Sequence, residues 1–428
     1  MQAALTLPPY SSPRSLQTFS KDNTKITLVV ILAASVCSVL FIFSLPSFTP
    51  PHFAFADSYL FPSKLSNANR IFPVSPLPSF AYLISGSEGD VPRILRLLYA
   101  TYHPLNHYLL HLDPSASDSD RIILISTVQS SAIFRAAKNV DVIGKPDFAN
   151  MAGSSGISAT LHGAAILEKI SSGWNWFLNL RAGDYQLVTQ DDLLHIFSYL
   201  PKEFNFVNHS CYIGWKESRK MKRMIVDPGL YLSQRSNVFY ISQGRELPNA
   251  FRLYTGSPFF FLSRKFVEHC VLGTDNLPRT LLMYFANTPF SLKNYFPTVL
   301  CNTRRFNRTI INHNLQHAAF DEYSSKAKHK ALNSSKYDEM IQSGAAFATG
   351  FEAEDDATLD RLDKEILRRH PQGVLQGGWC LDKPGSPSCS IWGSADVLRP
   401  GDGAGRLENG IVKRFSDANF RSQRCTEE

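Results

Sequence analysis

The sequence lacks the paired-cysteine spacing that marks a structural zinc site. It contains seven cysteines and 12 histidines, but no CxxC pair occurs that could complete a zinc site with the histidines. It also lacks a stripe of lysine and arginine interleaved with aromatic residues, and its formal net charge of +7 is modest for 428 residues. A zinc-stabilised module is therefore disfavoured, and we expect no nucleic-acid partner.

Standard nucleotide-binding fingerprints are absent as well. The turn Ser85–Asp90 reads SGSEGD, which is not GxGxxG and has no P-loop lysine. Nevertheless, the turn follows an apolar strand at Phe80–Ile84 and precedes a helix at Val91–Ala100 and a second strand at Tyr108–Leu112. A strand–turn–helix–strand unit predicts a parallel sheet that binds ligands at the carboxyl ends of its strands. A nucleotide is the first hypothesis for that ligand, and an ordinary polar turn is the alternative.

Several candidate site residues follow the predicted strands directly. Trp174 to Leu180 is a further buried strand, so its carboxyl end belongs to the same edge of the sheet. For Asp184, which follows it, loop capping and substrate contact are equally good interpretations. The candidates at these strand ends are Gly86, Ser87, Asp113, Asp184 and Tyr185.

The N-terminal region predicts a membrane anchor. Ile26 to Leu45 is a run of 20 residues without a charge, which is long enough to cross a bilayer as a helix. Basic residues precede this run, and none follows it until Lys64, an asymmetry that keeps the N-terminus in the cytosol. The alternative is a cleaved signal peptide ending near Ala54–Ala56. We therefore expect a cytosolic tail (1–25), an anchor (26–45), a stem rich in proline and serine (46–79) and a lumenal globular domain (80–428).

Composition and sequons agree with a lumenal globular domain. A hydrophobic content of 44% and a charged content of 19% allow a large core, in one large α/β domain or two smaller ones. Glycosylation sequons begin at Asn208, Asn307 and Asn333. Six cysteines lie outside the anchor and permit up to three disulfides, of which Cys380–Cys389 is the pair we predict.

Two acidic motifs favour a structural interpretation. Asp118-Ser119-Asp120 has the DxD form of many metal-dependent glycosyltransferases, but it lies in a serine-rich lead-in to a helix, which favours capping over metal binding. Asp191 and Asp192 open a helix at Leu193–Leu200 and complement its N-terminus. Further helices are expected at 120–129, 158–170, 264–270, 280–285 and 355–369, and strands at 140–143, 238–242 and 259–262. The segment after Gly377 is expected to be held by disulfides.

With these elements placed, the chain resembles glycosyltransferase family 14, which includes the core-2/I-branching N-acetylglucosaminyltransferases and the xylosyltransferases. Within it, the chain is most similar to plant β-glucuronosyltransferases that act on the galactan of arabinogalactan proteins. The blocks that carry the resemblance keep one order along the chain: 80–86, 102–113, 160–167, 176–198, 213–216, 227–231, 255–257, 275–284, 298–302, 377–380 and 399–409.

The resemblance implies a GT-A-like α/β fold with a Rossmann-type sheet and helices on both faces. It also implies a UDP-sugar donor, a glycan acceptor, the Golgi lumen, inversion at the anomeric carbon and no required metal. By position, Asp113 would contact the uridine part of the donor, while Asp184 and the loop Thr255-Gly256-Ser257 would face the sugars. Without a metal, lysine or arginine must stabilise the leaving UDP. Homo-oligomers, or hetero-oligomers with other Golgi transferases, are possible partners.

The chain departs from this family at three reactive positions. Relatives carry the expected base, a glutamate, where this chain has Lys293, and an ammonium group with a pKa of about 10.4 cannot accept a proton at neutral pH. A lysine expected at the diphosphate is replaced within Phe347–Phe351, where Gly350 stands. A tryptophan-containing block is replaced by 320–325, which begins with Phe320.

These departures leave two hypotheses. In the first, the protein is an active glucuronosyltransferase or related transferase whose base and phosphate contacts have moved. Its candidate bases are Asp227, Glu246 and Asp275, and its candidate phosphate contacts are Arg304, Arg305 and Lys328. In the second, it is a non-catalytic member of the family that binds a glycan or partners an active homologue. The complete fold-bearing blocks favour the first hypothesis.

Overall fold

The computed structural model describes residues 77–231, 237–318, 332–351, 356–370, 372–383, 386, 388–416 and 425. Within these ranges no helix has both the length and the apolar character that crossing a bilayer requires. The predicted tail and anchor, and nearly all of the predicted stem, lie outside the described residues. The first strand, β1, begins at Phe80.

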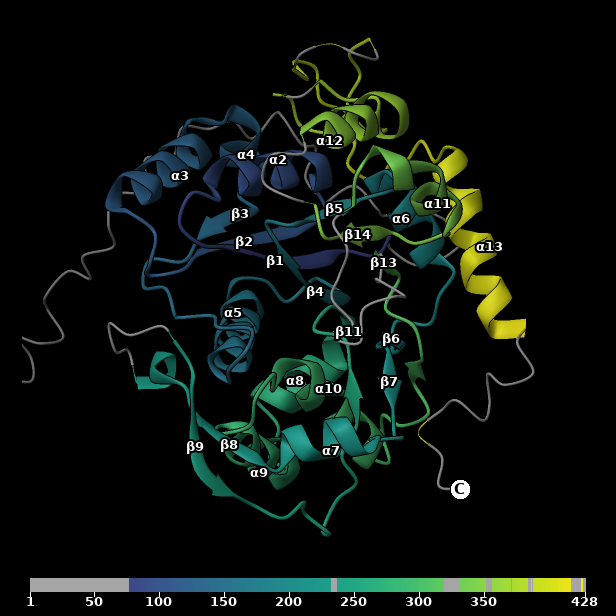
Figure 1. Ribbon diagram of the computed structural model, residues 1–428. Helices are drawn as coiled ribbons and strands as arrows, with labels where there is room; N and C mark the ends of the chain where they lie inside the picture. Colours follow the sequence, from purple (N-terminus) through teal and green to yellow (C-terminus); the bar gives the residue numbers. More distant parts are fainter. Residues whose placement is uncertain are drawn as a thin grey trace, which may run out of the picture. The chain divides into compact units, whose positions relative to one another are not determined.

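A seven-stranded sheet forms the centre of the described part of the chain (Figure 1). Its strand order is β12-β6-β11-β4-β1-β2-β3. The strands β1 to β4 pair in parallel, as the strand–turn–helix–strand unit predicts, but β11 pairs antiparallel with both β4 and β6. The sheet is therefore mixed and not purely parallel. Its strands are β1 (Phe80–Gly86), β2 (His107–Leu112), β3 (Val140–Val142), β4 (Trp176–Arg181), β6 (Asn205–Phe206), β11 (Phe261–Ser263) and β12 (Ile310–Ile311).

Three smaller sheets accompany the central one. They are β13 (Gln316–Ala318), β14 (Phe347–Thr349) and β5 (Asp184–Gln186) in one, β10 (Thr255–Gly256) with β7 (His209–Ser210), and β8 (Arg223–Val226) with β9 (Phe239–Gly244). In the first of these, β14 lies between the other two strands.

Helices cover both faces of the central sheet, as the family resemblance implies. Along β1, Phe80 and Tyr82 belong to one apolar cluster, which includes residues of α2, α3, α4 and α6. The intervening Ala81 and Leu83 belong to a second cluster, with residues of α5, α8, α9 and α10. This alternation places α2 and α5 on opposite faces of the sheet (Figure 1). The helices are α2 (Val91–Thr101), α3 (Asp118–Ser130), α4 (Ala132–Ala137), α5 (Ser155–Ile170), α6 (Gln190–Ser198), α7 (Trp215–Met221), α8 (Arg264–Val271), α9 (Asn276–Phe285), α10 (Leu292–Asn302), α11 (Tyr337–Gln342), α12 (Asp356–Leu362) and α13 (Asp402–Ser416), with short turns η2 (Pro228–Tyr231), η3 (Ser334–Lys336) and η4 (Asp363–Leu367).

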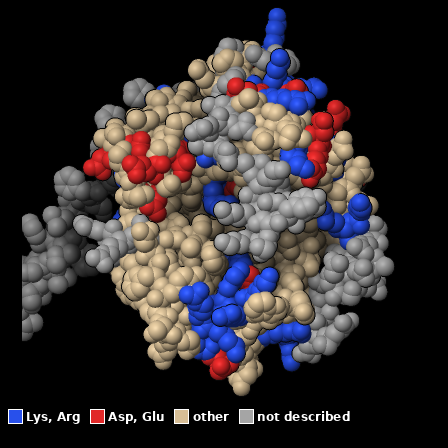
Figure 2. Space-filling view, viewed as in Figure 1, with Lys and Arg blue, Asp and Glu red and all other residues tan. Residues whose placement is uncertain are grey.

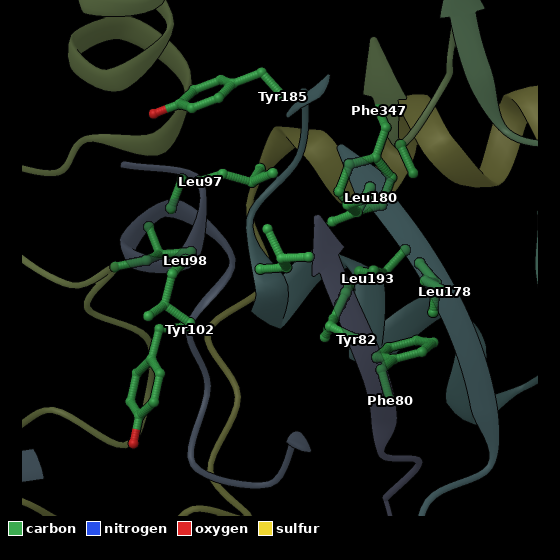
Figure 3. Packing of buried hydrophobic residues seen from close by; sticks show 14 of the residues in the cluster. Phe80, Tyr82, Leu97, Leu98, Tyr102, Leu178, Leu180, Tyr185, Leu193 and Phe347 are labelled. Carbon is green, nitrogen blue, oxygen red and sulfur yellow. The ribbon is translucent and has the colours of Figure 1, made fainter. Parts of the chain in front are cut away.

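Large aromatic side chains fill the first cluster (Figure 3). The Phe80 ring meets the Phe197 ring edge to face at 5.1 Å, and Tyr82 stacks on Tyr108 at 5.2 Å. Each pair adds about 0.5–1.5 kcal/mol beyond the burial of its area. These contacts join β1 to α6 and to β2. They fix the positions of the two strands whose carboxyl ends line the first cavity described below.

Most predicted elements are present, but five helices were not expected: the short α4, α7 and α11, and the longer α10 and α13. The helix α10 contains Pro297, which ordinarily argues against a helix interior. The helix α13 contains glycines that lower helix propensity. A Cβ atom on Gly403 would lie 2.2 Å from an oxygen of Asp192, and one on Gly410 would lie 2.8 Å from the carbonyl oxygen of Gly344. These two glycines therefore allow α13 to pack closely on its neighbours.

Two disulfides tie the C-terminal part of the chain. Cys380–Cys389 confirms the predicted pair, and Cys301–Cys425 joins α10 to a residue near the C-terminus. Cys211 and Cys270 are free thiols.

Candidate functional site

The first cavity lies at the carboxyl ends of β1, β2 and β4. It encloses about 220 Å³. Three residues predicted from the strand ends, Gly86, Ser87 and Asp113, line it together. Its other lining residues are Leu83, Ser85, Asp90, Arg93, Ala149, Met151, Gly156, Ala159, Thr160, Asn179, Leu180, Arg181, Ala182, Gly183 and Leu292.

The turn after β1 is held by close packing and hydrogen bonds. A Cβ atom on Gly86 would lie 2.6 Å from Ile94 Cδ1 and 2.8 Å from Asp90 Cβ, so only glycine fits where α2 approaches the strand. Asp90 Oδ2 accepts hydrogen bonds from the Ser87 amide (2.8 Å) and hydroxyl (3.0 Å). The turn is therefore a fixed wall of the cavity.

Asp113 is held at the end of β2 by backbone amides. Its Oδ1 accepts a hydrogen bond from the Ser115 amide (2.9 Å), and its Oδ2 accepts one from the Ala149 amide (3.0 Å). Each carboxylate oxygen has further acceptor capacity. A ligand hydroxyl or ring N–H in the cavity would therefore meet an oriented acceptor.

Asp184 and Tyr185 do not line the cavity. Asp184 is buried beside it, where its carboxylate accepts hydrogen bonds from the Arg181 amide (2.8 Å) and from Gln316 Nε2 (3.3 Å). Tyr185 lies in the core, and its hydroxyl bonds to Asp363 (2.5 Å) and to Arg369 (2.9 Å). Of the two interpretations of Asp184, this placement supports capping of the turn.

Two arginines bring positive charge to the first cavity. Arg93, on α2, donates through Nη2 to the Phe351 carbonyl oxygen at 2.7 Å. Arg181, at the end of β4, is half-exposed, with its Nη2 3.4 Å from Thr349 Oγ1. Sequence reasoning did not select either arginine. Both contact the strand-end segment 347–351, in which the family resemblance expects the lysine that Gly350 replaces.

A second cavity, of about 500 Å³, adjoins the first. Leu292 lines the first cavity and its neighbour Lys293 lines the second. Asn179, from the first, donates to the carbonyl oxygen of Pro258, from the second, at 2.8 Å. The second cavity is lined by Asn208, Gly256, Ser257, Pro258, Lys293, His313, Asn314, Gln316, His317, Ala318, Ser343, Ala345 and Arg414.

The predicted loop Thr255–Ser257 contributes to the second cavity. Gly256 pairs with His209, and a Cβ atom on Gly256 would lie only 1.9 Å from the carbonyl oxygen of Asn208. Ser257 Oγ accepts a hydrogen bond from Asn314 Nδ2 at 3.0 Å. Strand β10 therefore needs glycine here to pack against the segment around β7.

Lys293 lines the second cavity and is paired with a carboxylate. Its Nζ is 3.2 Å from Glu217 Oε2 on α7, and Glu217 Oε1 accepts a hydrogen bond from Lys220 at 2.7 Å. Partial burial disfavours the charge on Glu217, but the hydrogen bond from Lys220 and the charge of Lys293 outweigh it and lower the pKa of Glu217. Glu217 is therefore an ionised carboxylate beside the position where the family resemblance expects one.

The three carboxylates proposed as bases have other partners. Asp227 is buried, and its carboxylate accepts hydrogen bonds from the amides of Ser154, Ser155 and Gly229. Asp275 caps α9 by accepting from the Leu277 amide. Glu246 is exposed and pairs with Lys222 at 2.7 Å. None of the three lines either cavity.

The residues predicted to contact the phosphates do not line either cavity or lie outside the described residues. Arg304 and Arg305 are exposed and line neither cavity, and Arg305 stacks over Phe306 at 5.3 Å. Lys328, like Phe320 and the rest of the block 320–325, lies outside the described residues. Of the sequon asparagines, Asn208 and Asn333 are exposed and Asn307 is half-buried.

The acidic motifs have structural contacts. The cap of α3 is Ser117, and not the predicted Asp118-Ser119-Asp120 motif, which forms the first turn of the helix and places two acidic side chains there. Thr189 and Asp192 form a capping box on α6. Two groups of residues in the described part of the chain have metal-ligand spacing, but each includes both sulfurs of a disulfide, which supply no thiolate.

The site thus combines two adjoining cavities, the first of them at the sheet edge, as expected of an enzyme that joins two substrates. Comparison with protein families gives a match to the Core-2/I-Branching enzyme over residues 80–342. The chain belongs to this family of glycosyltransferases.

Its similarity to Arabidopsis thaliana proteins extends over most of the chain. It is 45% identical to β-glucuronosyltransferase GlcAT14A, over 87% of this chain and 82% of that protein. It is 43% identical to GlcAT14B (87% of each chain) and 41% identical to GlcAT14C (85% of this chain and 89% of that protein). Among solved structures, the bifunctional glycosyltransferase WbbM matches with a TM-score of 0.33 and 10% identity, over 69% of this chain and 50% of that one.

Proposed function

We propose that the protein transfers glucuronate from UDP-glucuronate to a galactan chain of an arabinogalactan-type glycoprotein, with inversion at the anomeric carbon. The observation that carries this proposal is the pair of adjoining cavities, one with two arginines and one with an ionised glutamate at its border. The Arabidopsis relatives, which are 41–45% identical, are β-glucuronosyltransferases by name, and this supplies the donor sugar.

The donor would occupy the first cavity. Asp113 is oriented to accept hydrogen bonds from the uridine, beside the fixed turn at Gly86 and Ser87. Arg93 and Arg181 would stabilise the negative charge that develops on the leaving UDP. They would do so in place of a divalent metal, which we propose is not required.

Glu217 would act as the general base. In a single displacement, the acceptor hydroxyl transfers its proton to a Glu217 oxygen while its own oxygen bonds to the anomeric carbon. The bond between that carbon and the UDP oxygen breaks, and its electron pair leaves with UDP. The lowered pKa of Glu217 keeps it ionised at neutral pH. Lys293 and Lys220 would then orient this carboxylate.

We further propose a Golgi membrane protein with a single N-terminal anchor and a lumenal catalytic part. The uncharged run Ile26–Leu45 and the two exposed sequon asparagines, Asn208 and Asn333, support this location.

The assay that tests this function uses detergent-purified full-length protein with UDP-glucuronate and a galactan acceptor. We expect transfer by the wild type, and a loss of about 10²–10⁴-fold in Glu217→Gln, the size of a general-base contribution. Glu203→Gln removes a carboxylate from another lysine–glutamate pair and serves as the control. Unchanged transfer by Glu217→Gln would show that the base lies elsewhere.

The placement of Lys293 at the expected base position favours one other function, a non-catalytic glycan-binding or partner protein. Lys293→Glu distinguishes the two hypotheses. If the base is Glu217, a second carboxylate beside it raises its pKa and lowers activity. An inactive wild type together with an active Lys293→Glu variant would instead support the non-catalytic function.

A further inference from the structure

Exposed aromatic rings and cations share one surface around α7. Tyr212 is 83% exposed and Trp215 is 70% exposed, although rings of this size usually bury most of their area. Figure 2 shows lysine and arginine gathered over the region of α7 in Figure 1. We define the α7 surface by Tyr212, Trp215, Lys216, Arg219, Lys220, Lys222 and Arg223.

The positive charge of the α7 surface is only partly neutralised. Lys220 pairs with Glu217 and Lys222 pairs with Glu246, each at 2.7 Å. In contrast, Lys216 and Arg219 are exposed and have no carboxylate within ion-pair distance in the described part of the chain. A surface with unpaired cations attracts anionic ligands, and salt screens that attraction.

The α7 surface continues directly into the second cavity. Strand β7 pairs with β10, whose Gly256 lines the cavity, and Tyr212 follows β7 by two residues. Glu217 of α7 pairs with Lys293, which also lines the cavity. A polymer that places one sugar in the second cavity would therefore extend over the rings and cations of α7.

We propose that the α7 surface is a subsite for a stretch of acceptor glycan that already carries glucuronate. This inference rests on the proposed function, because it extends the acceptor beyond the reacting sugar. The apolar C–H face of a galactose ring packs on Trp215 or Tyr212, and a uronate carboxylate pairs with Lys216 or Arg219. The protein would thus prefer chains that it, or a similar enzyme, has already modified.

The pattern of side chains fits a glycan better than a phospholipid surface. Trp215 has a cation beside its ring, with Lys216 Nζ 5.8 Å from the ring centre, and the guanidinium of Arg223 stacks on Tyr240 at 3.9 Å. Flat rings interleaved with cations suit an alternation of neutral and anionic sugars. Anionic vesicles are therefore a competing ligand in the test.

The test is equilibrium binding by the full-length protein, without donor, of two galactan oligosaccharides of equal length, one of which bears glucuronate. We expect tighter binding of the glucuronate-bearing chain, by about fivefold to tenfold for two exposed ion pairs. Lys216→Gln combined with Arg219→Gln should abolish this preference, and raised salt should weaken it. Trp215→Ala should weaken the binding of both chains.

A matched control removes Arg135 of α4 and Lys138, which caps that helix, as Arg135→Gln with Lys138→Asn; α4 packs in the first cluster, on the other face of the sheet. Both native residues are exposed, and asparagine tolerates the left-handed backbone of Lys138, whose φ is 51°. This control should keep the preference.

Equal binding of the two chains, or an unchanged preference in the α7 double variant, would overturn the proposal. So would vesicles of phosphatidylserine and phosphatidylcholine that bind the wild type and displace the oligosaccharide. Because no donor is present, a glucuronate preference without any transfer activity would refute the proposed function while supporting this subsite. Transfer to galactan, without a preference for the glucuronate-bearing chain in binding, would support the proposed function and refute the subsite.

Discussion

At the scale of single residues, the charge pair of Lys293 and Glu217 governs the expected pH dependence. The pKa of Glu217 is lowered from its ordinary value of 4.5, so the carboxylate should stay ionised, and the wild type active, down to pH 4.5, and activity should be lost only where the pH falls to the lowered pKa. Lys293→Met removes a hydrogen bond and a positive charge from Glu217. Lys220 alone then opposes the partial burial, so the pKa of Glu217 rises and the acidic limb of the kcat/KM profile should move to higher pH.

The control for that profile is Lys265→Met, which breaks an exposed pair with Glu203 of 2.9 Å. It should leave the acidic limb in place. An acidic limb at the same pH in Lys293→Met and wild type would mean that Glu217 is not the group that titrates.

Gly256 lines the second cavity, and its position should not tolerate a side chain. In Gly256→Ala, the new methyl group would lie 1.9 Å from the Asn208 carbonyl oxygen, so β10 must move away from β7. Overpacking of this kind costs about 1–3 kcal/mol, and displacement of the loop should also raise the KM for the acceptor. Thermal unfolding and steady-state kinetics measure the two effects.

Gly405→Ala provides the contrasting substitution. No atom lies within 4 Å of a Cβ placed at Gly405 on α13, so alanine should raise the stability by about 1 kcal/mol through helix propensity. If Gly256→Ala is as stable and as active as Gly405→Ala, Gly256 does not lie as close to the Asn208 carbonyl oxygen as the structure indicates.

The sequence identifies site residues only where their positions depend on local signals. Gly86 and Asp113 follow apolar strands, and the carboxyl ends of parallel strands meet at one edge, so both could be found. Glu217 is separated from Lys293 by 76 residues, and nothing local indicates that they meet. Arg181 could have been suspected from its place directly after a buried strand, where a charge also faces the sheet edge.

At the scale of elements, α6 organises the C-terminal segment through the two aspartates at its start. Asp191 Oδ2 accepts hydrogen bonds from the amides of Gly378 and Arg399, both at 2.7 Å, and Asp192 Oδ1 accepts one from Gly401 at 2.6 Å. The prediction of capping was right for Asp192, but it missed these long-range contacts. They depend on segments about 200 residues away, which local patterns do not reveal.

Asp191→Asn should weaken the attachment of this segment. Both hydrogen bonds end on one oxygen of Asp191, so the amide oxygen of asparagine can still accept them but without the charge of a carboxylate, at a cost of about 1–3 kcal/mol. Hydrogen exchange in residues 377–401 should rise, together with a lower melting temperature. Asp118→Asn, at the first turn of α3 but exposed, should change the stability by less than about 0.5 kcal/mol. If the two substitutions lower the melting temperature equally, Asp191 does not hold the C-terminal segment in the way proposed.

The unexpected helices show how tertiary contacts override local propensity. Pro297 offers no N–H to the carbonyl oxygen of Lys293, yet α10 forms because its side chains pack against β11 and α9 in the second cluster. In α13, Leu407 and Ile411 are buried against the first cluster, and the glycines allow that approach. The period of apolar residues predicted the other long helices because no such conflict arises in them.

At the scale of the whole molecule, two disulfides constrain loops of very different length. Cys301–Cys425 spans 124 residues and ties the chain near its C-terminus to α10, which also carries Lys293. Cys380–Cys389 spans nine residues. Spacing along the chain made the short pair predictable, while the long pair depends on how distant segments pack.

Removing the long disulfide should cost more stability than removing the short one. By loop-closure entropy, Cys425→Ser should lose about 5 kcal/mol and Cys389→Ser about 3 kcal/mol. Because the long bridge anchors the helix of Lys293, Cys425→Ser should also reduce transfer activity at temperatures where Cys389→Ser remains active. Melting temperature and activity should be measured on the oxidised and on the reduced protein. Reduction should lower the melting temperature of the wild type to below that of either oxidised variant, because it opens both disulfides. If Cys389→Ser proves the less stable of the two, chain entropy is not what the disulfides contribute, and local packing around Cys380 and Trp379 must dominate instead.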